Sequence, residues 1–512
     1  IHHVREVLIM GVVNAWRELF RPNPSAITRP RRRAYAGASM DRYTSSWVNP
    51  TSSADTEIKG SVKKLRSRAR QLIRDQDYCR NAIRAIVENV AGTGPRLQAQ
   101  IRMARGGKLN QKLNENVERN FAKWSKASSC DVAGKLTFNE MVRTAVSAWA
   151  SDGEVFIRLI RGKKFGDSEI PFALQILEAD MIDEDFQGGS TKKGEQWKMG
   201  VLLDNWGRPK KYACLTKHPG DTLFVNEPTV KDKHIIVDAA DIIHLATFSR
   251  PGQTRGVTWM ASAIQRMHHL EGYEQSELIR ARASSCLTAY IQSPEGELTS
   301  DGVDEEGERI FDMAPGQVKY LAPGESVTVP DLNAPDGQFE PFVRAMLRAL
   351  SASMGISYST LSRDSSQSNY SSSRLDLLQD QESFKALQAQ LKDILLDKVY
   401  QEWLEVAVLG GSLQLPNYQS EPERYQMARW MFKGAGWVDP MKEVQAANLA
   451  VKSGFKLQSQ VLSELSGSDL EEFLIARRNE QEMAESYGLS FDTDSVNIAT
   501  QAKVDETPDK SD

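Results

Sequence analysis

The chain has 512 residues, a length that allows about two to four domains of ordinary size. Hydrophobic residues make up 40% and charged residues 26%, which is typical of a globular protein, while the net charge of -4 argues against a protein that clamps DNA tightly through basic residues. The four cysteines are scattered and favour neither a zinc motif nor a disulfide framework, and no apolar run approaches the length of a membrane span.

The first 56 residues are predicted to form an extended arm. A short apolar patch follows Arg5 without a small-residue cleavage site, which favours an amphipathic segment over a signal peptide. Because residue 1 is Ile, translation is alternatively expected to begin at Met10. Residues 21–56 are rich in Pro, Ser, Arg and Thr, and their basic cluster at 31–33 either contacts nucleic acid or a neighbouring subunit, or is solvated.

The next part of the chain is predicted to be helical. Residues 57–91 carry apolar residues at helical spacing, and the GTGP run at 92–95 ends that helix. Residues 109–127 and 137–150 form two further predicted helices, and Thr137 with Glu140 caps the second. A basic face on the first helix is solvated, turned to another subunit or turned to DNA; it comprises Lys63, Lys64, Arg66, Arg68, Arg70 and Arg74.

A change of hydrophobic period marks a β-rich region that ends near Phe248. Residues 201–204 and 211–216 are predicted to pair as a hairpin around a turn. The other predicted strands cover residues 154–160, 172–177, 234–237 and 241–245.

Long helices dominate the second half of the chain. Helices are predicted over 257–285 and 339–354, and the insert between them is acidic, with short strands predicted at 287–292, 317–321 and 327–329. One long helix is predicted over 371–409, and shorter helices follow it. The acidic, polar end at 490–512 is predicted to be disordered.

A polar segment at 355–375 joins two of these helices. It is rich in Ser, Asn, Gln, Tyr, Asp and Arg, residues that favour turns and caps. It is either an ordinary surface loop or a loop that lets a polyanion slide past, because hydroxyls and amides contact phosphate weakly. Arg363 beside Asp364 leaves little net charge to grip such a polyanion.

The sequence contains few signals of catalysis. A phosphate-binding G-x-x-x-x-G-K-[ST] loop, a G-x-S-x-G elbow and an H-E-x-x-H pair are all missing, so neither a cofactor nor a metal is expected. His268 and His269 are adjacent, so they lie on different helix faces, and packing is favoured over metal binding. Glu178, Asp180 and Asp183 form either a charged turn at a strand end or a two-metal site of a nucleic-acid-processing enzyme.

Several motifs together resemble those of portal proteins of tailed bacteriophages, of the lambda type. The polar segment carries MGISY at 354–358, Leu361, Asp364 and NYSSSR at 369–374. The other blocks are DIIHL at 241–245, RPGQTRG at 250–256 and YLAPGE at 320–325, and the resemblance extends in order from Tyr43 to Leu489.

This resemblance implies an α+β, mainly helical portal fold, assembled as a ring, with a partly β-rich wing, stem helices, a small α/β clip and a helical C-terminal crown. The implied division is an arm at 1–56, a wing at 57–249, a first stem helix region at 250–285, a clip at 286–338, a second stem helix at 339–356, a channel loop at 357–373, a long helix at 374–415, a crown at 416–489 and a tail at 490–512.

The function that the resemblance implies is a dodecameric conduit at one capsid vertex, without catalysis of its own. The implied partners are copies of the chain, double-stranded DNA, the terminase large subunit, the major capsid and scaffold proteins and the head–tail connector, but no membrane. The protein would be in the virion, and in the host cytoplasm during assembly. The predicted channel contacts are Arg363, Ser365, Ser366, Gln367, Ser368, Asn369, Tyr370 and Ser371, and the predicted terminase-facing residues are Glu295, Glu297, Asp301 and Glu305.

Two alternatives remain open at this point. A metal-dependent enzyme would use the carboxylates at 178, 180 and 183, and its purified form would cleave nucleic acid. A capsid- or scaffold-binding protein without a channel would form no closed ring.

Overall fold

The computed structural model describes residues 51–103, 109–189, 192–221, 233–285, 290–292, 302–303, 309–310, 326–328, 337, 339–364, 366, 369–432, 440–466 and 470–489. Nearly all of the predicted arm, most of the predicted clip and the predicted tail lie outside these residues. The chain divides into Ile1–Ser53 and Ala54–Asp512, and the second unit is the one described below.

The first predicted helix is three helices: α2 (Ala54–Lys59), α3 (Val62–Asp75) and α4 (Asp77–Val90). The prediction of one helix was wrong because Gln76 adopts an extended backbone between α3 and α4. Its buried side chain donates to the Met267 carbonyl over 3.4 Å and accepts from the Cys79 thiol over 2.8 Å. These contacts stabilise a break that helical periodicity alone does not reveal.

The following helices are α5 (Gln111–Trp124), α6 (Ala127–Cys130) and α7 (Phe138–Asp152). The capping box at the start of α7 is confirmed, with Thr137 and Glu140 bonding to each other's backbone. Gly153 ends α7 with φ 90, a left-handed conformation, and a Cβ atom there would lie 2.1 Å from the Val257 backbone.

Two antiparallel sheets follow, and they contain the strands that the sequence predicts. In the first, β2 (Glu154–Arg161) lies between β3 (Phe172–Leu177) and β8 (Ile242–Ala246). The second has the order β4 (Gln196–Lys198), β5 (Val201–Leu203), β6 (Pro209–Leu215) and β7 (His234–Asp238), and contains the predicted hairpin. The short 3-10 helices η3 (Ala179–Met181) and η5 (Ala239–Asp241) follow β3 and β7. A strand pair that the sequence does not predict joins β1 (Arg96–Ala99) to β13 (Ala428–Met431).

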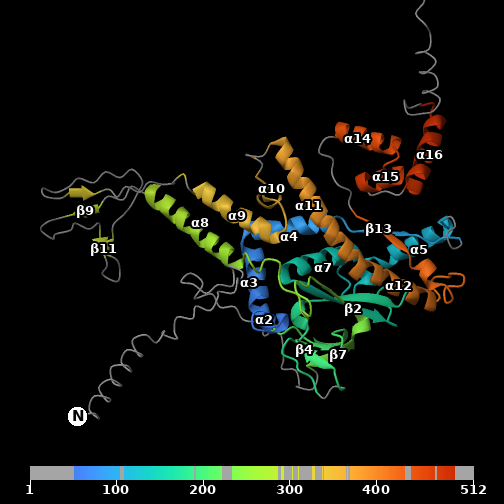
Figure 1. Cartoon of the computed structure of the whole chain (residues 1–512), viewed down its shortest axis with the longest axis horizontal. Helices are drawn as coiled ribbons and strands as arrows, with labels where there is room; N and C mark the ends of the chain where they lie inside the picture. Colours follow the sequence, from blue (N-terminus) through green and yellow to red (C-terminus); the bar gives the residue numbers. More distant parts are fainter. Residues whose placement is uncertain are drawn as a thin grey trace, which may run out of the picture. The chain divides into compact units, whose positions relative to one another are not determined.

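Two long helices lie side by side, α8 (Ile264–Ser285) and α9 (Phe339–Met354) (Figure 1). Tyr273 of α8 contacts Phe339 and Phe342 of α9, with ring centroids 5.8 Å and 4.5 Å apart. Helix α9 matches its predicted bounds, whereas α8 begins later than the predicted residue 257. His268 and His269 on α8 are exposed, so they do not pack in the core of this chain, and packing in the stem between subunits stays a prediction.

Short antiparallel pairs lie between α8 and α9 in the sequence. They are β9 (Tyr290–Gln292) with β12 (Ser326–Thr328), and β10 (Gly302–Val303) with β11 (Arg309–Ile310). The predicted strand at 317–321 lies outside the described residues.

The predicted helix at 371–409 is nearly continuous but changes type. It consists of α11 (Tyr370–Leu391), the π-helical stretch η6 (Lys392–Leu396) and α12 (Asp397–Leu409). A short helix, α10 (Tyr358–Ser362), precedes it inside the polar segment. The remaining described helices are α13 (Pro422–Tyr425), α14 (Pro440–Lys452), α15 (Gln458–Ser466) and α16 (Leu470–Ser486).

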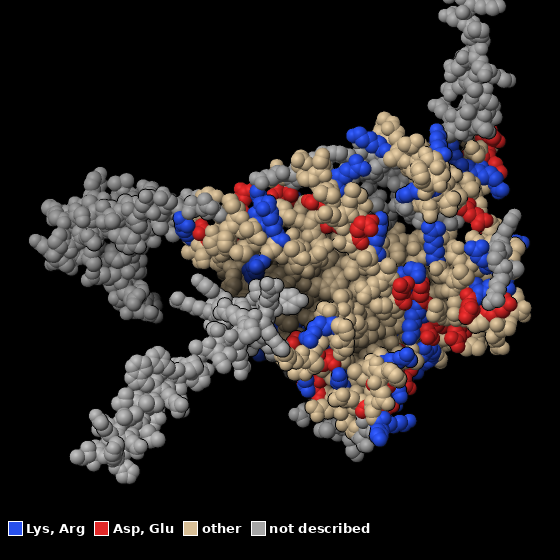
Figure 2. Space-filling view, in the orientation of Figure 1, with Lys and Arg blue, Asp and Glu red and all other residues tan. Residues whose placement is uncertain are grey.

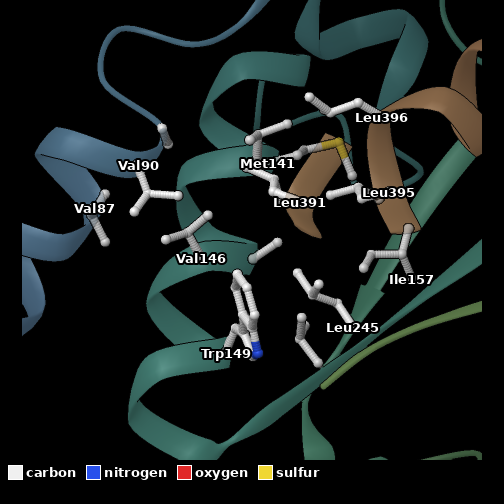
Figure 3. Packing of buried hydrophobic residues seen from close by; sticks show 14 of the residues in the cluster. Val87, Val90, Met141, Val146, Trp149, Ile157, Leu245, Leu391, Leu395 and Leu396 are labelled. Atoms are coloured by element: carbon white, nitrogen blue, oxygen red, sulfur yellow. The ribbon is translucent and has the colours of Figure 1, made fainter. Parts of the chain in front are cut away.

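The main core lies where α4, α7, α11 and η6 meet the first sheet (Figure 3). Trp149 of α7 packs there with Leu391 of α11, Ile157 of β2 and Leu245 of β8. A smaller cluster around Phe156 and other buried residues of η3 and the second sheet joins the two sheets. Helices and antiparallel strands thus pack together around the main core, so the α+β prediction is confirmed.

The surface is mixed in charge. Lys and Arg are interspersed with Asp and Glu over the described residues on the face in Figure 2, in keeping with the net charge of -4. Among the described helices, none combines the length and apolar character that a bilayer crossing requires.

Candidate functional site

The polar segment begins where α9 ends, and its first part contains a short helix, α10, that the sequence does not predict. Gly355 has φ 67, so the chain turns through a left-handed residue directly after Met354. Ser357 then caps α10, and its hydroxyl accepts from the Thr360 amide over 3.2 Å. Ile356 and Leu361 are buried, so the segment is attached to the core through two aliphatic side chains.

Asp380 of α11 binds the start of α10. Its carboxylate is buried, with 4% of the residue exposed. It accepts the Ser357 amide over 2.7 Å, the Ser357 hydroxyl over 2.7 Å and the Thr360 hydroxyl over 2.6 Å. The first turn of α10 is therefore attached to the helix that follows the loop.

Asn81 of α4 binds the other end of α10. Its side-chain amide donates to the carbonyl oxygens of Thr360 over 3.1 Å and Leu361 over 2.6 Å. Carbonyls at the end of a helix lack partners within the helix, and Asn81 supplies one for each of these two. Residues from two distant parts of the chain thus hold α10 at both ends.

Arg363 follows α10 in a left-handed conformation, with φ 56. Its Nε donates to the Asn81 Oδ1 atom over 3.3 Å, and Nη2 of Arg84 donates to the same oxygen over 2.6 Å. Glu88 lies 3.9 Å from Arg84 and 3.8 Å from Arg363. The loop therefore begins beside two guanidinium groups, where the sequence alone indicates one.

Asp364, the sequence neighbour of Arg363, has partners of its own. It accepts the Ser366 amide over 2.9 Å and the Tyr358 hydroxyl over 3.3 Å. The hydrogen bonds from Ser366 lower the pKa of this carboxyl below its ordinary value. The Asp364 carboxylate thus stabilises the turn at the start of the loop.

The end of the loop is fixed by a capping box at the start of α11. Asn369 accepts the Ser372 amide over 2.8 Å, and its own amide donates to the Ser372 hydroxyl over 3.1 Å. Ser366, Asn369 and Ser371 are exposed.

Some of the predicted site residues lie outside the described part of the chain. They are Ser365, Gln367 and Ser368 of the loop, the side chain of Tyr370, and the predicted clip residues Glu295, Glu297, Asp301 and Glu305.

The acidic turn after β3 binds the helix that the sequence marks as basic. Arg66 of α3 is 1% exposed and forms ion pairs with Asp180 and Glu184, each over 2.9 Å. Arg70 pairs with Asp152 over 2.6 Å and with Asp180 over 2.7 Å. The prediction of an outward basic face was therefore wrong for these two arginines.

This pairing also bears on the metal hypothesis. Ligand atoms of Glu178, Asp180 and His218 lie within 4.8 Å of one another, but Arg70 Nη2 lies 3.3 Å from Glu178 and 2.7 Å from Asp180. Burial raises the pKa of Asp180, but Arg66 and Arg70 lower it further, to below its ordinary value. Guanidinium groups thus neutralise these carboxylates.

The third predicted metal ligand, Asp183, has a different partner. It contacts His234 of β7 over 2.6 Å. Asp183 is therefore not part of the group formed by Glu178, Asp180 and His218.

The RPGQTRG motif at 250–256 is explained by a buried ion pair. Arg255 is fully buried and donates to Glu154 over 2.8 Å and to the carbonyls of Met199 over 2.8 Å and Ala179 over 2.9 Å. The Gly256 amide donates to the second Glu154 oxygen over 2.8 Å, and a Cβ atom at Gly256 would lie 2.2 Å from the Gly153 carbonyl. The motif thus joins the two sheets.

Comparisons with known proteins agree with this arrangement of motifs. The family model described as "Phage portal protein, lambda family" matches residues 40–388. The chain is 29% identical to the probable portal protein of Halomonas phage phiHAP-1, covering 82% of this chain and 81% of that protein. It is 23% identical to portal protein B of Escherichia phage lambda, covering 88% of this chain and 90% of that protein.

Among solved structures, a chain from the neck of the native GTA particle, computed with C12 symmetry, covers 77% of this chain and 92% of its own length, with 12% identity and a TM-score of 0.46. The family model covers more than half of the sequence, including the polar segment and the RPGQTRG motif. The chain belongs to the lambda family of phage portal proteins.

Proposed function

We propose that copies of this chain close into a dodecameric ring at one vertex of a phage capsid, and that double-stranded DNA passes through the ring. A terminase motor would drive DNA inward, and the same path would serve retention and ejection. Family membership and the names of the two relatives, both portal proteins, support this proposal. The chain itself would contribute no catalysis.

Several partners belong to the same proposal. The terminase large subunit would dock on the clip, with Glu295, Glu297, Asp301 and Glu305 as candidate contacts. The major capsid and scaffold proteins would surround the ring, and the head–tail connector would join it after packaging. The protein would assemble in the host cytoplasm and remain in the virion.

The observation that carries the proposal is the way the polar loop is held. Asp380 and Asn81 hold α10 before the loop, and the Asn369 capping box fixes the chain after it. The loop between these fixed ends offers hydroxyls, amides and one arginine. Repeated around a ring, such groups would make many weak contacts with the DNA backbone and hold it on the axis without a deep energy minimum.

A narrow deletion tests the loop. Removing residues 365–368 leaves α10, Arg363 and the Asn369 cap in place. We expect rings of normal shape in negative-stain electron micrographs, but less DNA per head after packaging or after storage. The matched control permutes the same four residues to Gln-Ser-Ser-Ser, which keeps length and composition and is expected to package normally. Intact rings with an unchanged DNA content after the deletion would contradict the proposed role.

A further inference from the structure

The start of the polar loop brings together two arginines that are far apart in the sequence. Arg84 projects from α4, and Arg363 follows α10; both donate to Asn81 Oδ1, over 2.6 Å and 3.3 Å. Their side chains are 52% and 62% exposed. Two guanidinium groups therefore meet at one amide oxygen, and more than half of each arginine side chain is exposed.

The charge around this pair is incompletely balanced. Glu88 is the one carboxylate within 4.0 Å of either guanidinium in the described part of the chain, at 3.9 Å and 3.8 Å. Both distances exceed a normal hydrogen bond, so Glu88 screens the two charges without engaging their N–H groups. A guanidinium carries five N–H donors, and two positive charges against one negative leave the site positive.

The face of α4 beside the pair is polar. One face of α4 carries the exposed Arg80 and Arg84 and the half-buried Asn81 and Glu88 at helical spacing, and none of these is an apolar anchor. Protein partners usually insert a buried apolar or aromatic anchor, for which this surface offers no counterpart. A ligand that is all charge and oxygen suits it better.

We propose that Arg84 and Arg363 together bind a backbone phosphate of double-stranded DNA. This inference rests on the proposed conduit function and adds Arg84, a residue outside the loop, to the DNA contacts. A phosphodiester presents two unesterified oxygens, which match the planar fork of a guanidinium. The contact reads no base and so would hold at any DNA sequence.

Glu88 gives this site a second property. Its carboxylate competes with phosphate for both arginines and so weakens each contact. A DNA that must move past the loop needs attachment points that release readily. Removing the Glu88 charge should therefore tighten the contact, whereas removing either arginine should weaken it.

The test uses purified full-length rings and a short fluorescein-labelled DNA duplex, with affinity measured by anisotropy over a series of salt concentrations. We expect Arg84→Gln and Arg363→Gln each to weaken binding roughly tenfold and to make the dependence of log K on log salt shallower. Glu88→Gln should tighten binding and steepen that dependence. Arg84→Lys should recover part of the affinity, because the charge returns without the fork.

The matched control is Arg208→Gln, which removes an exposed arginine at the turn between β5 and β6 and is expected to leave affinity unchanged. Opposite shifts for Glu88→Gln and Arg84→Gln cannot both come from misfolding. Binding of inorganic phosphate is measured separately on the same variants. Comparison with duplex binding distinguishes a site for any free anion from a site for the DNA backbone.

Three results would overturn the inference. The first is unchanged duplex affinity and salt dependence in both arginine variants. The second is an arginine variant that loses binding of inorganic phosphate but keeps duplex binding, because the pair would then bind a free anion and not the DNA backbone. The third is an equal loss in Arg208→Gln, which would mean a diffuse charge effect. Any of these, combined with a packaging defect in the 365–368 deletion, would refute the arginine pair while leaving the conduit function intact.

Discussion

At the residue scale, Asp380 shows how one buried carboxylate positions a loop. It accepts three hydrogen bonds at the start of α10, two from Ser357 and one from Thr360. Among the described residues no Lys, Arg or His lies within ion-pair distance of it, and its polar partners are an amide and two hydroxyl groups. The polar segment indicates a loop, but its sequence does not reveal that an aspartate in the next helix holds it.

Replacing Asp380 by Ala should remove the acceptor that the Ser357 amide, the Ser357 hydroxyl and the Thr360 hydroxyl share, at a partly buried position. We expect the free energy of unfolding to fall by about 2–4 kcal/mol, measured by urea denaturation of the full-length chain. Asp380→Asn keeps one acceptor oxygen, so it should cost less than Asp380→Ala. Equal stability of the alanine variant and the wild type would mean that this contact does not hold α10.

A second residue-scale prediction concerns acid stability. Burial raises the pKa of Asp183, but His234 and the Asp185 amide lower it further, so the folded-state pKa lies below the ordinary value. A lowered carboxyl pKa contributes stability above the unfolded-state pKa of about 4, and this stability is lost as the pH falls through the folded-state pKa.

Asp183→Asn removes this titration. We expect the melting temperature of the variant to fall less steeply than that of the wild type as the pH drops below about 4. Differential scanning fluorimetry across a pH series measures the difference. Asp185→Asn, which removes an exposed carboxylate in the same turn, is the control, and parallel melting curves for Asp183→Asn and wild type would contradict the prediction.

At the element scale, the pairing of β1 with β13 connects the helical N-terminal part with the chain beyond α12. Arg96 pairs with Met431 and Ala99 with Ala428. Each strand has four residues, too few for an alternating pattern to stand out, and their partners are distant in the sequence. Local periodicity therefore predicts β2, β3 and the β5–β6 hairpin but misses this pair.

Trp430 makes the importance of this strand pair measurable. It is 6% exposed, donates from Nε1 to Asp397 over 2.8 Å, and its ring lies 5.9 Å from that of Phe121. Trp430→Ala should lower the free energy of unfolding by about 3–5 kcal/mol in chemical denaturation. Phe455→Ala is the control, because Phe455 is 85% exposed and its loss should change stability little. Similar effects of the two substitutions would contradict the assignment of Trp430 to the core.

At the scale of the whole molecule, a basic helix and an acidic turn that are far apart in the sequence bind each other through ion pairs. The basic residues of α3 and the acidic turn after β3 are 114 positions apart at Arg66 and Asp180, yet they form one ion-pair cluster. Sequence patterns predict helices and strands because these depend on neighbouring residues. They do not predict which charged elements meet, because that depends on the packing of the whole chain.

The same limit applies to the candidate site. The polar loop and Arg363 could be predicted from composition and from the family motifs, whereas Arg84 could not, because it lies on a helix 279 positions away from the loop. The one signal in the sequence is the spacing of the polar residues Arg80, Asn81, Arg84 and Glu88 along one face of a helix. That spacing is equally typical of a solvated helix face.

The π-helical stretch η6 sets the rotation of α11 about its axis relative to α12, and so affects where the loop before α11 lies. A π-helical turn holds one residue more than an α-helical turn, and each residue advances a helix by about 100°. Lys392–Leu396 therefore offset the orientation of α11 relative to α12, while Leu395 and Leu396 remain buried. With one residue fewer, α12 could keep its packing only if α11 rotated, and Asp380 would face away from Ser357. The orientation of the polar loop therefore depends on the π-helical turn at the opposite end of α11.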